Sequence, residues 1–154
     1  METLIKADKT STLAYRAMLG VERALAQSSL SHSLRHLIQV RVSQINGCAF
    51  CIDMHWNDAR AAGETEQRLY GLSAWRDVPY YTDRERGALL LAEELTLIAG
   101  HGDLRDLYDQ LRPHFTEVEL GDLVWAIAAI NFWNRISIGY GSVPAAVPMP
   151  SLVH

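Results

Sequence analysis

At residues 41–55 the sequence reads RVSQINGCAFCIDMH, and this stretch signals the end of one helix and the start of another. The Asn-Gly pair at residues 46–47 is a typical helix stop, because glycine readily adopts the conformation that closes a helix. A new helix is then expected to begin at or near Cys48. On it Cys48, Cys51 and His55 stand at positions i, i+3 and i+7, which share one face.

The cysteine pair has the residue types needed for thiol redox chemistry. The chain has two cysteines, and a disulfide between them would close a loop too short to add much stability. A cysteine in a Cys-x-x-Cys motif at a helix start has a lowered pKa, and a nearby imidazole can take its proton. A thiolate attacks a peroxide, becomes a sulfenic acid and condenses with the second cysteine to a disulfide that an external dithiol reduces. These residues alone leave open which cysteine attacks, since Cys48 is nearer the expected helix start.

Outward from this motif, the sequence predicts an all-α bundle of about six helices. Apolar side chains recur at helical spacing, whereas strand-like alternation is rare. Capping boxes at Thr82–Glu85 and Thr116–Glu119 mark two helix starts. We expect one helical domain over residues 1–140 and a Pro-rich tail over residues 141–154. The expected helices cover about residues 11–28, 34–44, 48–63, 65–75, 82–99 and 116–138.

The last of these helices is apolar on most sides between Leu123 and Trp133. Trp125, Phe132 and Trp133 are therefore expected in the core or at a subunit interface. One small domain is not expected to cover all of this apolar surface. The helix therefore indicates a homo-oligomer.

The composition is that of a folded globular protein, with 49% hydrophobic and 21% charged residues in a chain of 154. A net charge of −4 without clusters of Lys or Arg argues against nucleic acid as the main partner. The N-terminal residues contain no apolar signal-peptide core, and no apolar run reaches the ~18 residues that span a bilayer. We therefore expect a cytoplasmic protein without a membrane partner.

The cysteine-containing stretch resembles the signature of the alkyl hydroperoxidase D-like (AhpD-like) family, within the carboxymuconolactone decarboxylase superfamily. Residues 85–93 and 128–135 are also similar to that family, so the likeness extends over most of the chain. The resemblance implies an all-α fold, a homo-trimer or homo-hexamer, and reduction of hydroperoxides without a bound organic cofactor or metal. It further implies that Cys51 is the peroxidatic cysteine, Cys48 the resolving cysteine and His55 the proton relay. The external dithiol would belong to a thioredoxin-like or lipoyl protein.

One position departs from the family pattern. The family commonly has a Glu twelve residues before the first cysteine, as the distal base of the relay, and here that position is His36. Because a histidine can accept a proton near neutral pH, the relay could survive in altered form. It could also be broken, which would leave a weak peroxidase or a thiol–disulfide enzyme. Glu93 is a candidate substitute carboxylate, and if buried among the leucines of its helix it would have a raised pKa.

Other functions stay open on the sequence. The cysteines could be buried apolar residues, or Cys48, Cys51 and His55 could bind zinc with His36 or His32 as the fourth ligand. The hypothesis of a zinc site is weaker, because no second Cys or His pair follows at short spacing. A decarboxylase-type enzyme of the same superfamily would not need the cysteines, and a purely structural oligomer would need no reactive thiol.

Overall fold

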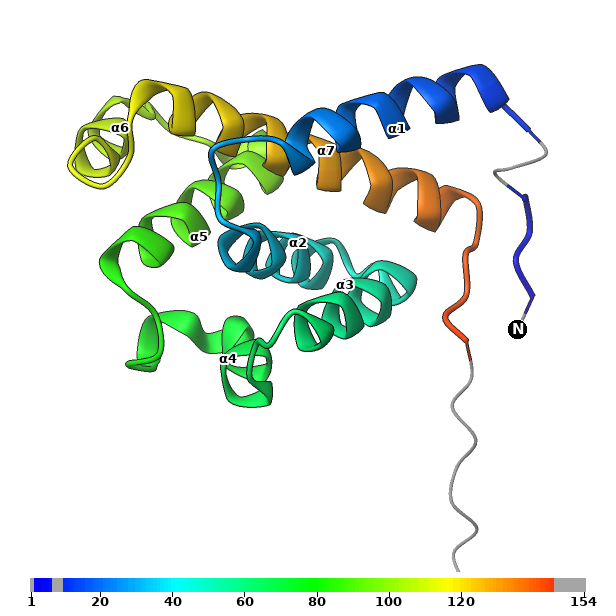
Figure 1. Ribbon diagram of the computed structural model, residues 1–154, viewed down its shortest axis with the longest axis horizontal. Coiled ribbons are helices and arrows are strands. Elements are labelled where there is room, and N and C mark those ends of the chain that lie inside the picture. The colour runs from blue at the N-terminus through cyan, green and yellow to red at the C-terminus, as the bar shows by residue number, and fades with distance from the viewer. Residues whose placement is uncertain (1, 7–9, 146–154) are drawn as a thin grey trace, which may run out of the picture.

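The computed structural model describes residues 2–6 and 10–145, which form an all-α bundle (Figure 1). These ranges contain no strand, which confirms the predicted fold class, and none of their helices is long and apolar enough to cross a membrane. Of the expected Pro-rich tail, residues 141–145 follow the last helix without helical structure, and residues 146–154 lie outside the described ranges. The α-helices are α1 (Thr12–Ala26), α2 (His32–Asn46), α3 (Ala49–Ala61), α4 (Glu66–Gly71), α5 (Asp83–Thr96), α6 (Arg105–Leu111) and α7 (Glu117–Gly139); the 3₁₀ helices η1 (Leu72–Asp77) and η2 (Ile98–Gly100) follow α4 and α5.

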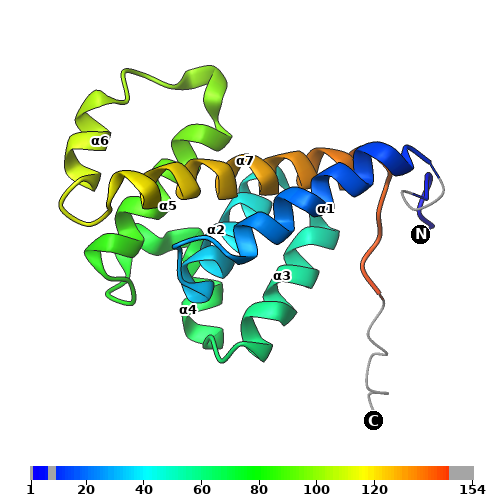
Figure 2. The same cartoon turned by 45° about the horizontal axis from the view of Figure 1, so that its top comes forward.

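Helix α2 lies at the centre of the bundle and packs against α3, α5 and α7 (Figures 1 and 2). Its side chains Ile38 and Val42 are fully buried in a core shared with α5, α6 and α7, and Leu37 is fully buried in a second core shared with α3, α4 and η1. Helix α1 runs beside α7, as Figure 2 shows. The central α2 thus supports α3 on one side and the α1–α7 pair on another.

The two predicted capping boxes are present. In the first, the hydroxyl of Thr82 accepts a hydrogen bond from the Glu85 N–H, and the carboxylate of Glu85 accepts one from the Thr82 N–H. Thr116 and Glu119 make the same two hydrogen bonds in the second.

Helix α6 was not predicted, so the described residues contain one α-helix more than expected. Leu104 at its N-cap has no side-chain acceptor, but Oδ1 of Asp103, one residue earlier, accepts the N–H of Arg105 at 3.0 Å. Asp103 was therefore the start signal that the sequence offered for this helix.

Helix α2 ends and α3 begins at a turn formed by Gly47 and Cys48. Gly47 has a φ of +68°, a left-handed conformation that costs glycine little. Its N–H donates to Gln44 O at 3.2 Å, and the N–H of Cys48 donates to Ser43 O at 3.0 Å, which closes the last turn of α2. Cys48 is then the N-cap of α3, so both the predicted stop and the predicted start are confirmed.

Amide side chains connect this turn to α7. Asn46 Nδ2 donates to Oδ1 of Asn134 at 2.8 Å and to Oδ1 of Asn131 at 3.0 Å. Asn134 is fully buried, and its own Nδ2 donates to Ser43 Oγ at 3.1 Å. Because a buried polar group is costly unless it is hydrogen-bonded, this network favours one placement of α7 on α2.

We predict that Asn134→Ala lowers the free energy of unfolding by about 2–3 kcal/mol, because the side chains of Asn46 and Ser43 lose a buried partner. Urea unfolding measures this change. Asn57→Ala, on the exposed side of α3, is the control and should change the stability by less than about 0.5 kcal/mol. An equally small effect at both positions would show that the amide network does not hold α7 in place.

Candidate functional site

The two cysteines lie in the first turn of α3. Cys48 and Cys51 form a disulfide with a Cα–Cα distance of 5.3 Å, which is ordinary for such a bond. The Cys48 sulfur also accepts the backbone N–H of Cys51 at 3.3 Å, so this sulfur caps the helix. Only 2% of Cys48 and 1% of Cys51 is exposed. The structure therefore brings the pair together at a helix start, as the spacing predicts.

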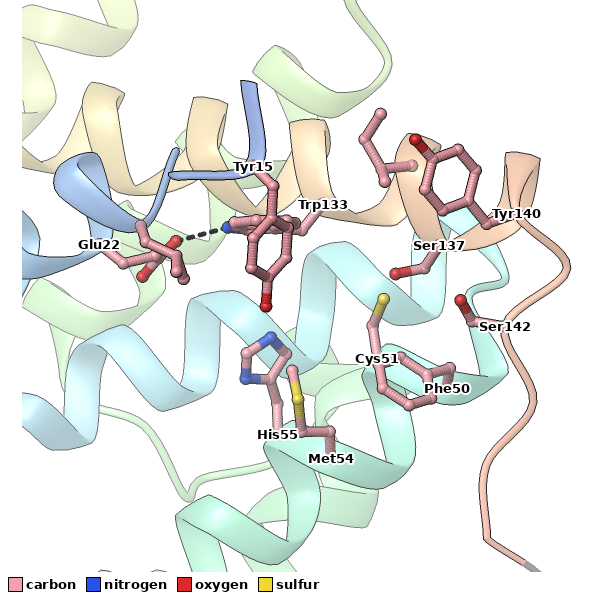
Figure 3. Close-up of a pocket in the computed structure, with 12 residues that line it drawn as sticks. Tyr15, Glu22, Phe50, Cys51, Met54, His55, Trp133, Ser137, Tyr140 and Ser142 are labelled. Atoms are coloured by element: carbon pink, nitrogen blue, oxygen red, sulfur yellow. Dashed lines mark hydrogen bonds between the residues drawn. The ribbon is translucent and has the colours of Figure 1, made fainter. Parts of the chain in front are cut away.

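His55 lies one turn further along α3 and is 8% exposed. Its Nδ1 is 3.9 Å from Oδ2 of Asp58, while its Nε2 is buried and has no hydrogen-bond partner among the described residues. In Figure 3 the His55 ring points from α3 toward the hydroxyl of Tyr15, and the Cys51 side chain rises from the same side of the helix. One face of α3 thus presents a sulfur and an imidazole to the same space.

Burial lowers the pKa of His55 to about 4. The Asp58 carboxylate raises this pKa, and the nearby His36 and Arg35 lower it, but the loss of hydration is the largest cause. The imidazole is consequently neutral at pH 7. A neutral imidazole has a ring nitrogen that can accept a proton, although a pKa this low makes it a weak base.

A pocket of about 380 Å³ opens beside Cys51 and His55 (Figure 3). Its walls come from α1, α3, the C-terminal half of α7 and the residues just after α7. Cys51 lines this pocket and Cys48 does not, so a molecule inside it meets the Cys51 sulfur first. The large apolar and aromatic residues of the wall are Tyr15, Leu19, Phe50, Met54, Trp133, Ile136 and Tyr140.

Trp133 and Glu22 connect α7 to α1 at the wall of this pocket. The indole Nε1–H of Trp133 donates to Glu22 Oε1 at 2.8 Å, and the ring of Tyr15 meets Trp133 edge-on with 5.7 Å between ring centroids. Sequence reasoning missed Tyr15 and Glu22, because no motif marks them and only the fold brings α1 to the cysteines. Their one available signal was that Tyr15, Leu19 and Glu22 share a face of their helix.

His36 does not line this apolar pocket but lines a second pocket that also includes His55. A polar pocket of about 280 Å³ is lined by both histidines together with Glu22, Arg35 and Asp58. Nδ1 of His36 is buried and has no hydrogen-bond partner in the described part of the chain, and burial is the largest cause of its lowered pKa. His55 therefore borders an apolar pocket that contains Cys51 and a polar pocket that contains His36.

The carboxylate of Glu93 is hydrogen-bonded and ion-paired outside the two pockets that His55 lines. Its Oε1 accepts hydrogen bonds from Arg41 at 2.7 Å and from Trp75 Nε1 at 2.8 Å, and its Oε2 is 2.6 Å from Arg76. Burial raises the pKa of this carboxyl, but the three donors outweigh burial and lower it. The expected raised pKa is wrong, because the sequence did not show that these donors converge on Glu93. The carboxylate lines neither pocket beside His55.

The zinc alternative finds no support in the geometry. In residues 2–6 and 10–145, no three His, Cys, Asp or Glu side chains are grouped so that they could hold a metal ion. The sulfurs of Cys48 and Cys51 are bonded to each other, and His32 and His36 border the polar pocket, which neither cysteine lines. The four ligands of a closed zinc site are thus not assembled.

Comparison with known proteins gives matches that include the cysteine motif. A model of the carboxymuconolactone decarboxylase family matches residues 12–94, a range that contains both cysteines, His36 and His55. The uncharacterized protein YdfG of Bacillus subtilis (strain 168) is 48% identical over 131 residues, which are 85% of this chain and 89% of YdfG.

Two solved structures have the same fold. A protein of unknown function from Agrobacterium tumefaciens, described as a candidate antioxidant defence protein AhpD, is 40% identical with a TM-score of 0.91 over 95% of this chain and 100% of that one. An uncharacterized peroxidase-related protein from Silicibacter sp. TM1040 is 25% identical with a TM-score of 0.78 over 88% of this chain and 72% of that one.

We predict that the protein loses stability as the pH falls from about 6.5 to about 4, and that His55 causes much of the loss. An unfolded histidine binds its proton near pH 6.5, whereas folded His55 does so near pH 4, so the unfolded state binds more protons within this window. Across this window, His55 should lower the free energy of unfolding by on the order of 3 kcal/mol. Urea unfolding across this range should show a shallower pH dependence for His55→Gln, and an unaltered slope would contradict the lowered pKa. His101→Gln, at an exposed position, controls for the loss of a histidine.

Proposed function

The chain belongs to the carboxymuconolactone decarboxylase family, and on this premise we propose that it reduces organic hydroperoxides with Cys48 and Cys51. One observation carries the proposal: Cys51, one half of a disulfide-forming pair, faces an apolar pocket beside a buried, neutral imidazole. The candidate AhpD-type antioxidant role of the Agrobacterium relative supports the same chemistry.

The first step is an attack on the peroxide bond. His55 takes the proton of the Cys51 thiol, and the thiolate attacks the terminal oxygen of the hydroperoxide. The O–O bond breaks, Cys51 becomes a sulfenic acid, and the leaving alkoxide takes the proton from His55 to become an alcohol. The substrate class follows from the pocket, because aromatic and aliphatic walls favour an organic group on the peroxide.

The second step forms the disulfide that the structure contains. The Cys48 sulfur attacks the sulfenic sulfur of Cys51, an S–S bond forms, and hydroxide leaves with the Cys48 proton as water. Two electrons have then passed from two thiols to the peroxide. Cys51 is assigned the first attack because it lines the pocket, whereas Cys48 does not.

An external dithiol then resets the pair by thiol–disulfide exchange. Since Cys51 is the cysteine that borders the pocket, the incoming thiolate attacks Cys51 and displaces Cys48. This access favours a dithiol carried on a narrow arm or at an exposed tip, as in lipoyl or thioredoxin-like proteins. Such a reductant fits the cytoplasmic location expected from the sequence.

His36 serves in this scheme as the second station of the proton relay. It borders the polar pocket with His55, and its charge affects the pKa of His55. In this scheme the proton that His55 takes from Cys51 is shared with His36 across the polar pocket, and it returns through His55 to the leaving alkoxide.

We predict that reduced wild-type protein loses two hydrogens when it is treated with one equivalent of an organic hydroperoxide. Cys51→Ser should lower the rate of peroxide consumption roughly a thousandfold or more, because the nucleophile is gone. Cys48→Ser should consume one equivalent and stop with one added oxygen on Cys51. Stopped-flow kinetics and mass analysis of the cysteine peptide measure these outcomes.

Two results would contradict this proposal. A sulfenic acid on Cys48 of the Cys51→Ser variant, formed at the wild-type rate, would reverse the roles of the cysteines. Wild-type thiols that do not react with peroxide would refute the peroxidase chemistry itself. Turnover of a decarboxylase substrate by the Cys48→Ala, Cys51→Ala double variant would instead favour the decarboxylase activity.

We predict that a substitution at His36 changes the reaction rate, whereas a substitution at Glu93 changes the stability. His36→Gln should slow the oxidation of Cys51 about tenfold or more without a large change in stability, because it interrupts proton transfer. Glu93→Gln should leave this rate within about twofold but lower the free energy of unfolding by about 3 kcal/mol, because Arg41 and Arg76 lose their counter-charge. Peroxide kinetics and urea unfolding of both variants test the pair, and an unchanged rate in His36→Gln would remove His36 from the relay.

A further inference from the structure

Tyr15 places a hydroxyl in the same pocket as Cys51 and His55, and neither step of the proposed peroxide reduction uses it. The side chain comes from α1, on which Tyr15, Leu19 and Glu22 follow one another at helical spacing and all line the pocket. In Figure 3 the Tyr15 hydroxyl points toward the His55 ring and makes no hydrogen bond with the other pocket residues drawn there. Tyr15 therefore presents an O–H donor to the space in front of the imidazole.

Contacts between α1 and α7 hold the Tyr15 ring in this position. The ring meets Trp133 edge-on, and the indole N–H of Trp133 donates to Glu22 at 2.8 Å. Since Glu22 belongs to the same helix as Tyr15, this hydrogen bond fixes Trp133 relative to the helix that carries the phenol. The packing of α1 on α7 thus sets where the Tyr15 hydroxyl lies.

The group that Tyr15 faces is a hydrogen-bond acceptor. Nδ1 of His55 is 3.9 Å from Oδ2 of Asp58, and this carboxylate favours the tautomer with the proton on Nδ1. Nε2 then carries a free lone pair, and it is buried without a hydrogen-bond partner among the described residues. In Figure 3 the nitrogen at the tip of the ring, which is Nε2, points toward the Tyr15 hydroxyl. A donor and an acceptor thus face each other across the pocket, and an oxygen atom between them can meet both.

The position between Tyr15 and His55 fits the oxygen that leaves when the peroxide bond breaks. Because the thiolate attacks along the axis of the O–O bond, the leaving oxygen lies farther from Cys51 than the attacked oxygen does. It must also lie within reach of His55, which returns the proton to it. The two serine hydroxyls of the pocket lie on the Cys51 side, and the hydroxyl of Tyr140 points away from His55 (Figure 3). Tyr15 thus has the hydroxyl at the far end of the O–O bond.

We infer that Tyr15 is a catalytic residue whose hydroxyl donates a hydrogen bond to the leaving oxygen of the hydroperoxide, an inference that rests on the proposed function. As the Cys51 thiolate attacks, an S–O bond forms, the O–O bond breaks, and the electron pair of that bond passes to the leaving oxygen. The Tyr15 O–H stabilises the negative charge that develops there. Tyr15 keeps its own proton, and His55 delivers the thiol proton to the alkoxide.

The walls of the pocket explain why a donor at this position matters. An anionic oxygen in apolar surroundings is costly unless it is hydrogen-bonded, and most of the large side chains around this pocket are apolar or aromatic. Tyr15 is 36% exposed, so water can replace part of its effect when the hydroxyl is removed. We therefore expect a loss of about tenfold, less than the roughly hundredfold or more that follows removal of a fully enclosed donor.

Tyr15→Phe tests the inference, because it removes the hydroxyl and keeps the ring that packs on Trp133. Stopped-flow oxidation of reduced Tyr15→Phe by tert-butyl hydroperoxide should be about tenfold slower than that of wild type. Oxidation by peracetic acid should slow by less than about threefold, because its carboxylate leaving group needs little stabilisation. Alkylation of Cys51 by iodoacetamide, which has no leaving oxygen, should keep its wild-type rate.

Tyr70→Phe on α4, where the tyrosine is 59% exposed, controls for the loss of a phenol hydroxyl and should leave all three rates unchanged. Circular dichroism should show the same helix content in both variants as in wild type. Equal rates of Tyr15→Phe and wild type with tert-butyl hydroperoxide would overturn the inference. An equal loss with all three reagents would overturn it too, because Tyr15 would then act on the thiolate or on the shape of the pocket. Wild-type thiols that react with iodoacetamide but with neither peroxide would instead refute the proposed function, and the inference with it.

Discussion

The left-handed turn at Gly47 sets the direction in which α3 leaves α2, and the position of each reactive group depends on it. Backbone hydrogen bonds close this turn, and the adjoining Asn46 connects it to Asn131 and Asn134 on α7. The turn thus places the first residues of α3 against the C-terminal half of α7. A helix that left α2 in another direction would separate the cysteines from the wall that α7 and α1 provide.

His55 is the point at which two different environments meet. It lines the apolar pocket that contains Cys51 and also the polar pocket that contains His36 and Asp58. Burial keeps the imidazole neutral, and the Asp58 carboxylate near Nδ1 limits how far its pKa falls. The same burial that removes water from the sulfur therefore leaves His55 in contact with polar side chains.

Local signals predicted the fold well where they occurred. The capping boxes at Thr82 and Thr116 and the glycine stop at residue 47 each depend on a few adjacent residues, and the structure contains all three. Helix α6 has no capping box, and its single capping side chain, Asp103, was missed. Spacing within one helix also predicted that Cys48, Cys51 and His55 share a face.

The remaining parts of the site depend on contacts between distant segments. Glu22 and Trp133 are far apart in the chain, and their hydrogen bond exists only once α1 lies along α7. The surroundings of Glu93 escaped prediction for the same reason, because Arg41, Trp75 and Arg76 come from two other segments. A single sequence shows which residues are chemically able to act, but not which of them the fold supplies with partners.

The cap that Cys48 provides for α3 also bears on how the disulfide is opened. A leaving thiol departs faster when its thiolate is stabilised, and the Cys51 backbone N–H already points at the Cys48 sulfur at 3.3 Å. The positive end of the α3 dipole lies at the same place. In the proposed exchange, in which a reductant attacks Cys51, the departing Cys48 thiolate would remain the helix cap. The hydrogen bond from the Cys51 N–H to the Cys48 sulfur, which caps the first turn of α3, would thus also make Cys48 a good leaving group.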